Sequence, residues 1–307
     1  MRILVTGGAG FIGSHFVQGL RDADVTVLDK LTYAGNPANL DGVPHTFTQG
    51  DICDAELLGR IVPGHDLVVN FAAESHVDRS IEGAAEFVRT NVLGTQTLLQ
   101  ACLEAGVPKV VHVSTDEVYG SIDEGSWDES APLRPRSPYA ASKAGGDLIA
   151  EAYAVTHGLN VSITRCGNNY GPRQYPEKVI PLFVTNLLRG WKVPLYGDGG
   201  NVRDWIHVED HCAAIRLVAE KGGPGEVYHI AGTAELTNRE LTARLLEACG
   251  RDWDLVEPVA DRKGHDRRYS LDDRKLRALG YRPRVSFEQG LKETVRWYAE
   301  HRDWWSR

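Results

Sequence analysis

The 307-residue sequence has few cysteines, a single methionine, no long apolar run and fewer basic than acidic side chains. Its five cysteines, Cys53, Cys102, Cys166, Cys212 and Cys249, are odd in number and widely spaced, without a Cys-x-x-Cys pair. This pattern favours free thiols in a reducing compartment over a disulfide framework. No apolar stretch is long enough to span a bilayer, and the start, MRILVTGG, lacks the features of a signal peptide.

The charge balance excludes further classes of function. The sequence has 34 Lys and Arg against 42 Asp and Glu, a net charge of -8. This balance argues against general binding of nucleic acids or anionic membranes, although a local basic pocket for a phosphorylated ligand is compatible with it. With 42% hydrophobic and 25% charged residues, the composition is that of a globular protein of one or two domains. We therefore expect a cytoplasmic enzyme or binding protein.

Glycines follow the first predicted strand, residues 2–6, at the spacing of a dinucleotide-binding loop. Gly7, Gly10 and Gly13 would allow a tight turn, close approach of a pyrophosphate and close packing of the following helix. A second strand, predicted at residues 25–28, ends at Asp29. A carboxylate there would accept hydrogen bonds from an adenosine ribose and repel a 2′-phosphate, which predicts NAD rather than NADP. The alternative is that Asp29 only forms a turn.

Strands and helices continue to alternate beyond this point. We expect strands at residues 45–49 and 67–71, a long helix over residues 82–105 interrupted at Gly94, and another strand from residue 109. This order predicts an α/β fold of the Rossmann type, with a doubly wound parallel sheet. A turn-rich segment then leads into a smaller mixed α/β region for substrate. The predicted domains are residues 1–170 and 171–307, without excluding that later segments return to the first domain.

Two polar clusters are candidates for catalysis. Thr115, Asp116 and Glu117 follow a buried β-branched strand at its carboxyl end, where open α/β sheets bind ligands. Adjacent carboxyls in different environments can serve as one acid and one base, although the same residues also suit an N-cap and a turn. Tyr139 and Lys143 lie four residues apart on one face of a predicted helix. An ammonium near the phenol would lower its pKa and make Tyr139 a base; alternatively, the pair is an exposed helix face.

These motifs together resemble a known group of enzymes. The segments TGGAGFIG, FAAESHVDRS, STDEVYG and SPYAASK are similar to those of the extended short-chain dehydrogenase/reductase superfamily, and specifically of its nucleotide-sugar 4,6-dehydratases. The similarity continues through NNYGP, PEKVIPLFV, PLYGDGGNVRDWIHVEDH, LTNRE and DRKGHDRRYS and covers essentially the whole chain. TDEVYG is the most specific segment, because related 4-epimerases generally lack the Asp-Glu pair and related decarboxylases keep only the Glu.

The resemblance implies a carbon-oxygen lyase that converts dTDP-glucose to dTDP-4-keto-6-deoxyglucose, with tightly bound NAD accepting a hydride from carbon 4 and returning it to carbon 6. Tyr139, aided by Lys143 and the positive ring of the cofactor, would take the proton of the 4-hydroxyl. Glu117 would remove the proton on carbon 5, Asp116 would protonate the departing 6-hydroxyl, and Thr115 would hydrogen-bond the 4-keto oxygen.

The resemblance also implies the ligand contacts. The expected NAD contacts are Gly7, Gly10, Phe11, Ile12, Gly13, Asp29, Lys30, Leu31, Thr32, Asp51, Ile52, Ala72, Ala73, Ser75, Thr90, Tyr139, Lys143 and Asn169. The expected substrate contacts are Ser75, Thr115, Asn168, Lys178, Val179, Pro194, Leu195, Tyr196, Arg203, Asn238 and the segment from Asp261 to His265, including Arg262. Relatives pair the helices that correspond to residues 82–105 and 139–153, so we expect a homodimer.

Several alternatives stay open. One is a UDP-sugar 4,6-dehydratase, since dTDP and UDP differ by one methyl and one hydroxyl group. Others are a nucleotide-sugar 4-epimerase or decarboxylase and, from another class, a Rossmann protein that senses NAD without turnover. His207 and His211 are four residues apart, as metal ligands on a helix can be, but the segment is not His-Glu-x-x-His, so no metal is expected.

Overall fold

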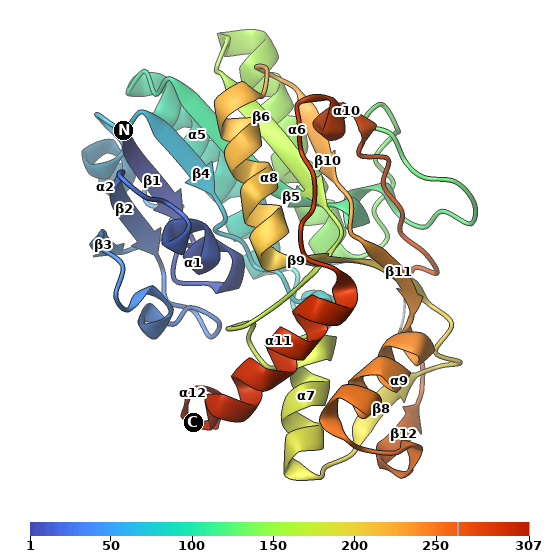
Figure 1. The fold of residues 1–307 in the computed structure, drawn as a ribbon. Helices are drawn as coiled ribbons and strands as arrows, with labels where there is room; N and C mark the ends of the chain where they lie inside the picture. The colour runs from blue at the N-terminus through green and yellow to red at the C-terminus, as the bar shows by residue number, and fades with distance from the viewer. Residues whose placement is uncertain (263, 307) are drawn as a thin grey trace.

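The computed structural model describes residues 1–262 and 264–306, and a seven-stranded parallel sheet forms its centre (Figure 1). In spatial order the strands are β10 (Val227–Ile230), β6 (Val161–Cys166), β5 (Lys109–Thr115), β4 (Leu67–Asn70), β1 (Arg2–Thr6), β2 (Asp24–Asp29) and β3 (Thr46–Gln49). The chain adds strands on one side of β1 and then on the other, so the direction of winding reverses between β1 and β4. The predicted doubly wound sheet is confirmed, and ligands bind such sheets at this reversal.

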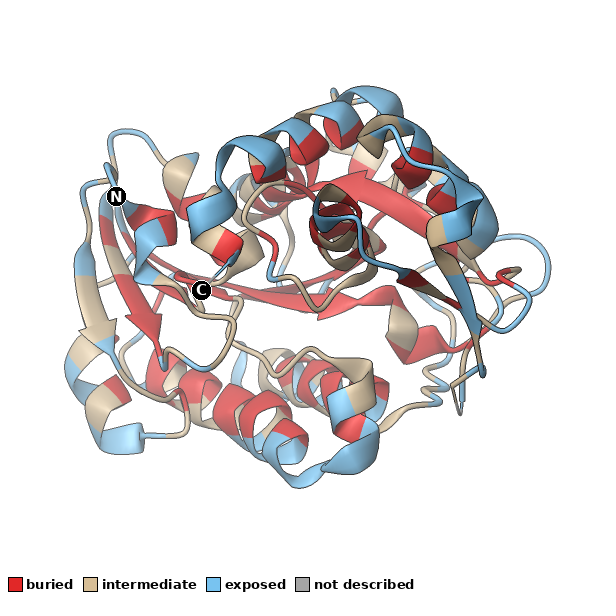
Figure 2. Ribbon diagram, turned by 90° about the horizontal axis from the view of Figure 1, so that it is seen from below, coloured by how far each residue is buried: buried red, intermediate tan, exposed pale blue. Residues whose placement is uncertain are grey.

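Helices cover both faces of this sheet, as the view from below shows (Figure 2). Successive side chains of a strand point to opposite faces. Ile3 therefore packs on one face with α1 (Phe11–Gln18) and α8 (Val208–Lys221), while Leu4 packs on the other. The layer beside Leu4 consists of α2 (Ala55–Ile61), α5 (Thr95–Glu104) and α6 (Pro138–His157). Burial on both faces explains why these strands are almost continuously apolar.

The connection from β4 to β5 differs from the single interrupted helix predicted over residues 82–105. It consists of α3 (Val77–Glu82), α4 (Ala85–Val88), a π-helical turn over Arg89–Gly94, and α5. The predicted helix begins later than expected because the extended backbone of Gly83 separates α3 from α4. The interruption occupies the whole π-helical turn, which brings the carbonyl of Asn91 against α6. A Cβ on Gly146 would lie only 2.6 Å from that oxygen, so glycine is needed there.

A smaller lobe lies below the large sheet in Figure 1. Its strands are β7 (Asn168–Tyr170), β8 (Val193–Tyr196), β9 (Val202–His207), β11 (Ala234–Thr237) and β12 (Val256–Val259), and its helices are α7 (Val179–Arg189), α9 (Asn238–Cys249), α11 (Phe287–Glu300) and α12 (Arg302–Trp305). Of these, α7, α9 and α11 pack together in one core. The short helix α10 (Arg274–Ala278) instead packs against β10 of the large sheet.

Segments after residue 170 contribute to both lobes, because α8 and β10 pack with the seven-stranded sheet. The boundary at residue 170 itself stays a prediction. No helix in the described ranges is both long enough and apolar enough to cross a membrane.

Candidate active site

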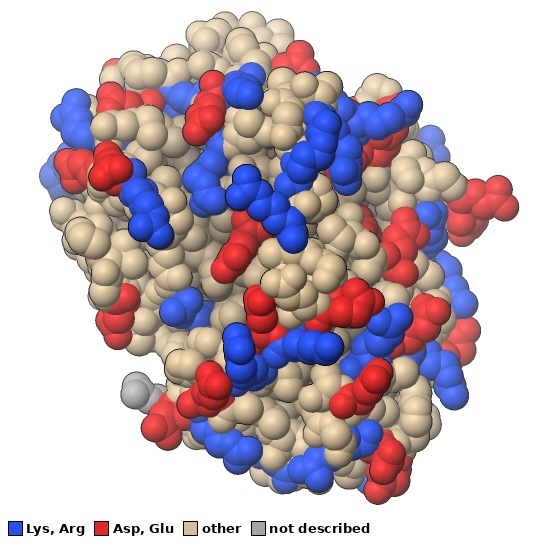
Figure 3. Space-filling model, viewed as in Figure 1, with Lys and Arg blue, Asp and Glu red and all other residues tan. Residues whose placement is uncertain are grey.

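A cavity of about 460 Å³ lies at the carboxyl edge of the seven-stranded sheet and extends to the smaller lobe. The glycine-rich loop and the ends of β2, β4 and β5 line one part, and residues of α7, β8 and β9 line the other. Its volume is within the usual range for small-molecule sites. Acidic and basic side chains are interspersed on the face shown in Figure 3. Individual buried cations such as Arg203, rather than a broad basic surface, therefore supply positive charge to the cavity.

The glycine-rich loop has no room for larger residues at its tightest points. Gly7 has a φ of 68°, and a Cβ there would lie 2.6 Å from the backbone nitrogen of Ala72. A Cβ on Gly13 would lie 2.3 Å from the carbonyl oxygen of Gly7. The first turn of α1 can therefore approach the end of β4 closely, which leaves a glycine-lined space at the helix N-terminus. This geometry fits a pyrophosphate.

Asp29 lies at the end of β2 with its carboxylate against the glycine-rich loop. Its Oδ2 accepts a hydrogen bond from the backbone N–H of Ala9 at 2.9 Å, and its Oδ1 accepts one from Leu31 at 2.8 Å. Burial raises the pKa of Asp29, and these backbone donors oppose the rise. Nearby, Lys30 pairs with Asp51 at 2.9 Å. Two backbone donors thus hold the Asp29 carboxylate at the cavity wall, while free lone pairs on its oxygens can accept ribose hydroxyls.

Thr115, Asp116 and Glu117 connect β5 to a 3₁₀ turn over Asp116–Tyr119. The hydroxyl oxygen of Thr115 accepts a hydrogen bond from the backbone N–H of Glu117 at 3.3 Å, so the predicted N-cap is present. All three side chains also line the cavity. The structural and catalytic interpretations of this segment are therefore compatible.

The two carboxyls of this turn lie in different electrostatic surroundings. Burial raises the pKa of Asp116 well above its ordinary value, and the negative charges of Glu117 and Asp204 raise it further. Burial also raises the pKa of Glu117, but Arg203, Arg262 and Lys178 oppose the rise. Asp116 therefore favours the protonated form of an acid, whereas Glu117 has cationic neighbours that favour the carboxylate of a base.

Tyr139 and Lys143 project from the first turns of α6 into the cavity wall. The side chain of Ser137 caps this helix by accepting a hydrogen bond from Ala140, and Pro138 occupies its first position. The ammonium of Lys143 donates to the carbonyl oxygen of Val113 at 2.7 Å. This hydrogen bond joins the end of β5 to the first turns of α6.

The expected lowering of the Tyr139 pKa is wrong for the protein alone. Burial raises the pKa of this phenol well above 10, and the negative charge of Glu117 raises it further. Lys143 is also buried, and burial lowers its pKa. Tyr139 consequently needs an additional positive charge in the cavity to act as a base.

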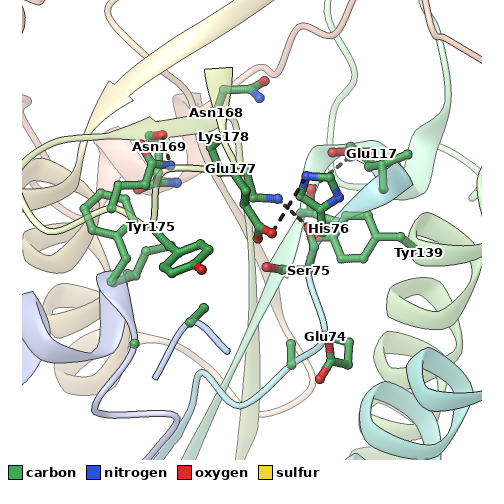
Figure 4. Close-up of a pocket in the computed structure, with 18 of the residues that line it drawn as sticks. Glu74, Ser75, His76, Glu117, Tyr139, Asn168, Asn169, Tyr175, Glu177 and Lys178 are labelled. Atoms are coloured by element: carbon green, nitrogen blue, oxygen red, sulfur yellow. Dashed lines mark hydrogen bonds and ion pairs between the residues drawn. The ribbon is translucent and has the colours of Figure 1, made fainter. Parts of the chain in front are cut away.

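Contacts from two other segments of the chain meet at Glu177, a residue of the cavity wall that Figure 4 shows beside His76 and Lys178. The Tyr33 hydroxyl donates to Oε1 of Glu177 at 2.9 Å, and Nε of Arg79 lies 3.3 Å from Oε2. The guanidinium of Arg79 also lies 3.7 Å from the centre of the Tyr33 ring. Lys178 donates to the carbonyl oxygen of Ser75 at 2.5 Å. We refer to Tyr33, Arg79 and Glu177 as the Glu177 clasp.

The cavity brings together nearly every residue that the sequence suggested. All the expected catalytic, cofactor and substrate residues that the structure describes line it except Leu31, Asp261 and Gly264. Leu31 instead donates its backbone N–H to Asp29, and Asp261 accepts a hydrogen bond from His265 at 2.6 Å. Lys263, within the expected segment, is outside the described residues. The main cavity-lining residues that the sequence did not identify are Glu74, His76, Gln174, Tyr175, Glu177 and Trp205. Glu74 and His76 could have been found, because they flank Ser75 in the motif FAAESHVDRS.

The two histidines considered as metal ligands have other contacts. His207 caps α8 by accepting a hydrogen bond from the backbone N–H of Glu209 at 3.4 Å. The Nδ1 of His211 lies 2.8 Å from the side-chain oxygen of Asn169. Burial lowers the pKa of His211 to about 3, so its imidazole is neutral. Within residues 1–262 and 264–306, no group of three or more His, Cys, Asp or Glu side chains could hold a metal ion.

Known proteins share this fold and sequence. The family model described as GDP-mannose 4,6 dehydratase matches residues 4–294. A dTDP-glucose 4,6-dehydratase of Streptomyces antibioticus is 60% identical, over 99% of this chain and 94% of that protein. The structure of DesIV, a dTDP-glucose 4,6-dehydratase from Streptomyces venezuelae solved with NAD and a thymidine nucleotide bound, is 64% identical and superposes with a TM-score of 0.98 over 99% of each chain. A Thermus thermophilus UDP-glucose 4-epimerase solved with NAD is 38% identical, with a TM-score of 0.92 over 98% of this chain and 100% of that one.

The doubly wound sheet, the glycine-rich loop and the Tyr139–Lys143 pair define a short-chain dehydrogenase/reductase. Within that class, the chain belongs to the nucleotide-sugar 4,6-dehydratase family, which includes the dTDP-glucose 4,6-dehydratases.

The Glu177 clasp can be tested with Tyr33→Phe, which removes one hydroxyl and keeps the ring under Arg79. Loss of a hydrogen bond of about 1 kcal/mol should increase local opening of the three segments that carry these residues by about fivefold. Backbone hydrogen exchange of residues 74–79 and 175–178 would measure this local opening. The matched control is Tyr228→Phe, which removes a hydrogen bond to the N–H of Gly223, a residue that does not line the cavity. Equal exchange in these segments in both variants would contradict the clasp.

Proposed function

We propose that this chain removes water from dTDP-glucose, giving dTDP-4-keto-6-deoxyglucose with NAD as its hydride carrier. The observation that supports this most strongly is the Asp116–Glu117 pair, which lines the same cavity as Tyr139 and has two different electrostatic surroundings. A 4-epimerase needs only to oxidise and reduce carbon 4. Elimination of a hydroxyl also needs an acid and a base, and this site contains both.

The cavity fits NAD at two points. The glycine-lined space beside Gly7 and Gly13 suits the pyrophosphate, and the Asp29 carboxylate suits the adenosine ribose. Bound NAD supplies a hydride acceptor at carbon 4, a donor at carbon 6 and a positively charged ring. The positive charge of that ring would favour the Tyr139 phenolate, whereas burial alone keeps the phenol protonated.

The side chains of the chain then move the protons. Tyr139 accepts the proton of the 4-hydroxyl as carbon 4 is oxidised. The new 4-keto group, hydrogen-bonded by Thr115, acidifies the proton on carbon 5, and Glu117 removes it. Asp116 donates its proton to the departing 6-hydroxyl, which leaves as water. Return of a proton to carbon 5 completes the product.

The smaller lobe supplies the cations for the nucleotide diphosphate. Arg203 is buried in β9, where its guanidinium donates to the carbonyl oxygens of Val202 at 2.7 Å and Asp266 at 3.0 Å. These contacts fix the guanidinium plane and leave further N–H groups for phosphate oxygens. Lys178 and Arg262 line the same part of the cavity. Their charges would bind the diphosphate and also act on Glu117.

The reaction and the nucleotide preference can be tested by incubating the purified protein with dTDP-glucose and, separately, with UDP-glucose. Mass spectrometry should detect the loss of one water from dTDP-glucose and much less from UDP-glucose. Loss of water from UDP-glucose alone would identify a UDP-sugar dehydratase. An unchanged mass with both sugars would contradict dehydration and favour a 4-epimerase, whose product has the same mass.

The acid role of Asp116 can be tested with the isosteric variant Asp116→Asn. General acid catalysis typically contributes a factor of about 10² to 10⁴, so elimination should slow by at least about a hundredfold. Initial oxidation at carbon 4 should change much less, since Tyr139 and not Asp116 takes that proton. Transient absorbance of the reduced nicotinamide would follow oxidation, and mass spectrometry would follow water loss. Dehydration at the normal rate would refute the role; Glu117→Gln is the comparison that removes the base instead.

We also propose that the protein is a homodimer in the cytoplasm. Among the described residues, large exposed apolar side chains gather on α3, the segment Ala85–Gly94 and α6; they include Ile81, Val88, Leu93 and Leu148. Exposed apolar patches of this kind commonly mark protein interfaces. The five free cysteines agree with a reducing compartment. Light scattering at micromolar concentration should give twice the monomer mass, and Leu148→Glu should reduce it; a monomeric wild-type protein would contradict the proposal.

A further inference from the structure

A row of buried polar side chains crosses the seven-stranded sheet beneath the active site. Thr6, Asn70 and His112 occupy paired positions on β1, β4 and β5. The Thr6 hydroxyl donates to Oδ1 of Asn70 at 2.6 Å, and Nδ2 of Asn70 donates to Nδ1 of His112 at 3.1 Å. Because Nδ1 of neutral His112 accepts this bond, its proton is on Nε2. Nε2 of His112 lies 3.5 Å from Oδ1 of Asp147, and neither atom has a hydrogen-bond partner among the described residues.

Asp147 is completely buried on α6 and connects this row to a second set of polar groups. Its Oδ2 accepts a hydrogen bond from Nε of Arg165 at 2.8 Å. Arg165 in turn donates to the Tyr119 hydroxyl at 2.6 Å and to Glu151 at 3.2 Å. The Asp147 carboxylate is thus held by Arg165 on β6 and lies close to His112 on β5, and the catalytic steps above do not use any of these groups.

The charged residues of α6 repeat at a spacing of four. Lys143, Asp147 and Glu151 lie one turn apart on the same helix face. Arg165 divides its single positive charge between Asp147 and Glu151, so these three groups together carry one net negative charge. That charge lies one helical turn from the buried ammonium of Lys143.

We propose that Asp147 is a positioning residue for the reaction proposed above: held by Arg165 one helical turn after Lys143, its carboxylate keeps Lys143 protonated. The inference rests on the proposed function of Tyr139 and Lys143. A neutral lysine could not support the Tyr139 phenolate, so the effect of Asp147 reaches the substrate through Lys143.

The physical need for this residue follows from the burial of Lys143. A buried ammonium is costly unless other charges and acceptors compensate. Its only hydrogen-bond acceptor among the described residues is the Val113 carbonyl. Burial lowers the pKa of Lys143, and the negative charge of Asp147 on α6 opposes this. The other titratable group that acts on Lys143 is Cys166 on β6, a thiol whose pKa burial raises to about 12, so it supplies no charge at neutral pH. The charged or titratable groups that act on Asp147 are His112, Arg165 and Lys143.

The test is the pH dependence of oxidation at carbon 4 in Asp147→Asn. Lys143 should lose its proton more readily, the Tyr139 phenolate should become less stable, and Tyr139 should require a higher pH to act as a base. The acidic limb of the single-turnover rate should therefore move up by about one pH unit. The rate at high pH and the KM should change little. A purely structural role would lower the rate equally at every pH.

A second readout does not depend on activity. The side-chain nitrogen signal of Lys143, assigned with Lys143→Met and followed by NMR, should titrate at a lower pH in Asp147→Asn than in the wild-type protein. The matched control is Asp210→Asn, which removes an equally buried carboxylate that accepts hydrogen bonds from the backbone of Arg284 and Val285 and does not line the cavity. Asp210→Asn should shift neither the acidic limb of the single-turnover rate nor the titration of the Lys143 nitrogen signal.

Glu151→Gln covers the case in which Asp147→Asn does not fold. Its side chain is 37% exposed, so folding should tolerate the change. With Glu151 uncharged, the positive charge of Arg165 would act on Asp147 only. The acidic limb of the rate and the titration of the Lys143 signal should then shift in the same directions as in Asp147→Asn, by smaller amounts. Unshifted readouts in the folded variants, or an equal shift in Asp210→Asn, would overturn the inference. Water loss by the wild-type protein tests the proposed function separately.

Discussion

The burial of ionisable groups at the carboxyl edge of the sheet is the constraint on which the site depends. Asp116, Tyr139 and Lys143 are each less than a tenth exposed. Desolvation favours the neutral form of each: it raises the pKa of Asp116 and Tyr139 and lowers that of Lys143. A protonated acid is what elimination needs from Asp116. A protonated Tyr139 is a poor base, however, so the site depends on charges that its ligands and the rest of the fold provide.

The two lobes provide these charges from different directions. Arg203 and Lys178 of the smaller lobe act on Glu117, while Asp204, the neighbour of Arg203 on β9, acts on Asp116. Consecutive residues of one strand thus have opposite effects on Asp116, whose pKa Asp204 raises and Arg203 lowers, and Arg203 also lowers the pKa of Glu117. The lobe that would bind the nucleotide diphosphate therefore also helps to decide which carboxyl is the acid. Diphosphate binding and elimination are coupled through the same cations, since a bound diphosphate would draw on the positive charge that Glu117 otherwise receives.

The sequence was informative where local patterns determine structure. The β-branched strands, the loop from Gly7 to Gly13 and the positions of Asp116 and Tyr139 follow from composition and spacing, and the structure places these residues around one cavity. The π-helical turn over Arg89–Gly94 was missed because its cause is tertiary: the Asn91 carbonyl packs against Gly146. The pKa of Tyr139 was predicted in the wrong direction because sequence spacing shows that Lys143 is near but not how deeply both groups are buried. Contacts such as Tyr33 with Glu177 join residues 144 positions apart, and no local pattern indicates them.

The four-residue spacing of polar side chains on α6 predicts which of them share a helix face, but not whether that face is buried. Tyr139, Lys143, Asp147 and Glu151 recur every fourth residue, so the sequence alone places them on one face. It does not show that this face is buried, and an exposed face would make Asp147 an ordinary solvated carboxylate. The burial of Arg165 in β6 gives Asp147 a different role. A buried guanidinium requires a partner, and Oδ2 of Asp147 lies 2.8 Å from Nε of Arg165. Because Arg165 alone would neutralise Asp147, the charge of Glu151 is needed to leave one net negative charge on these three groups. The helix that carries Tyr139 therefore also carries, two turns further on, Asp147, whose charge acts on Lys143.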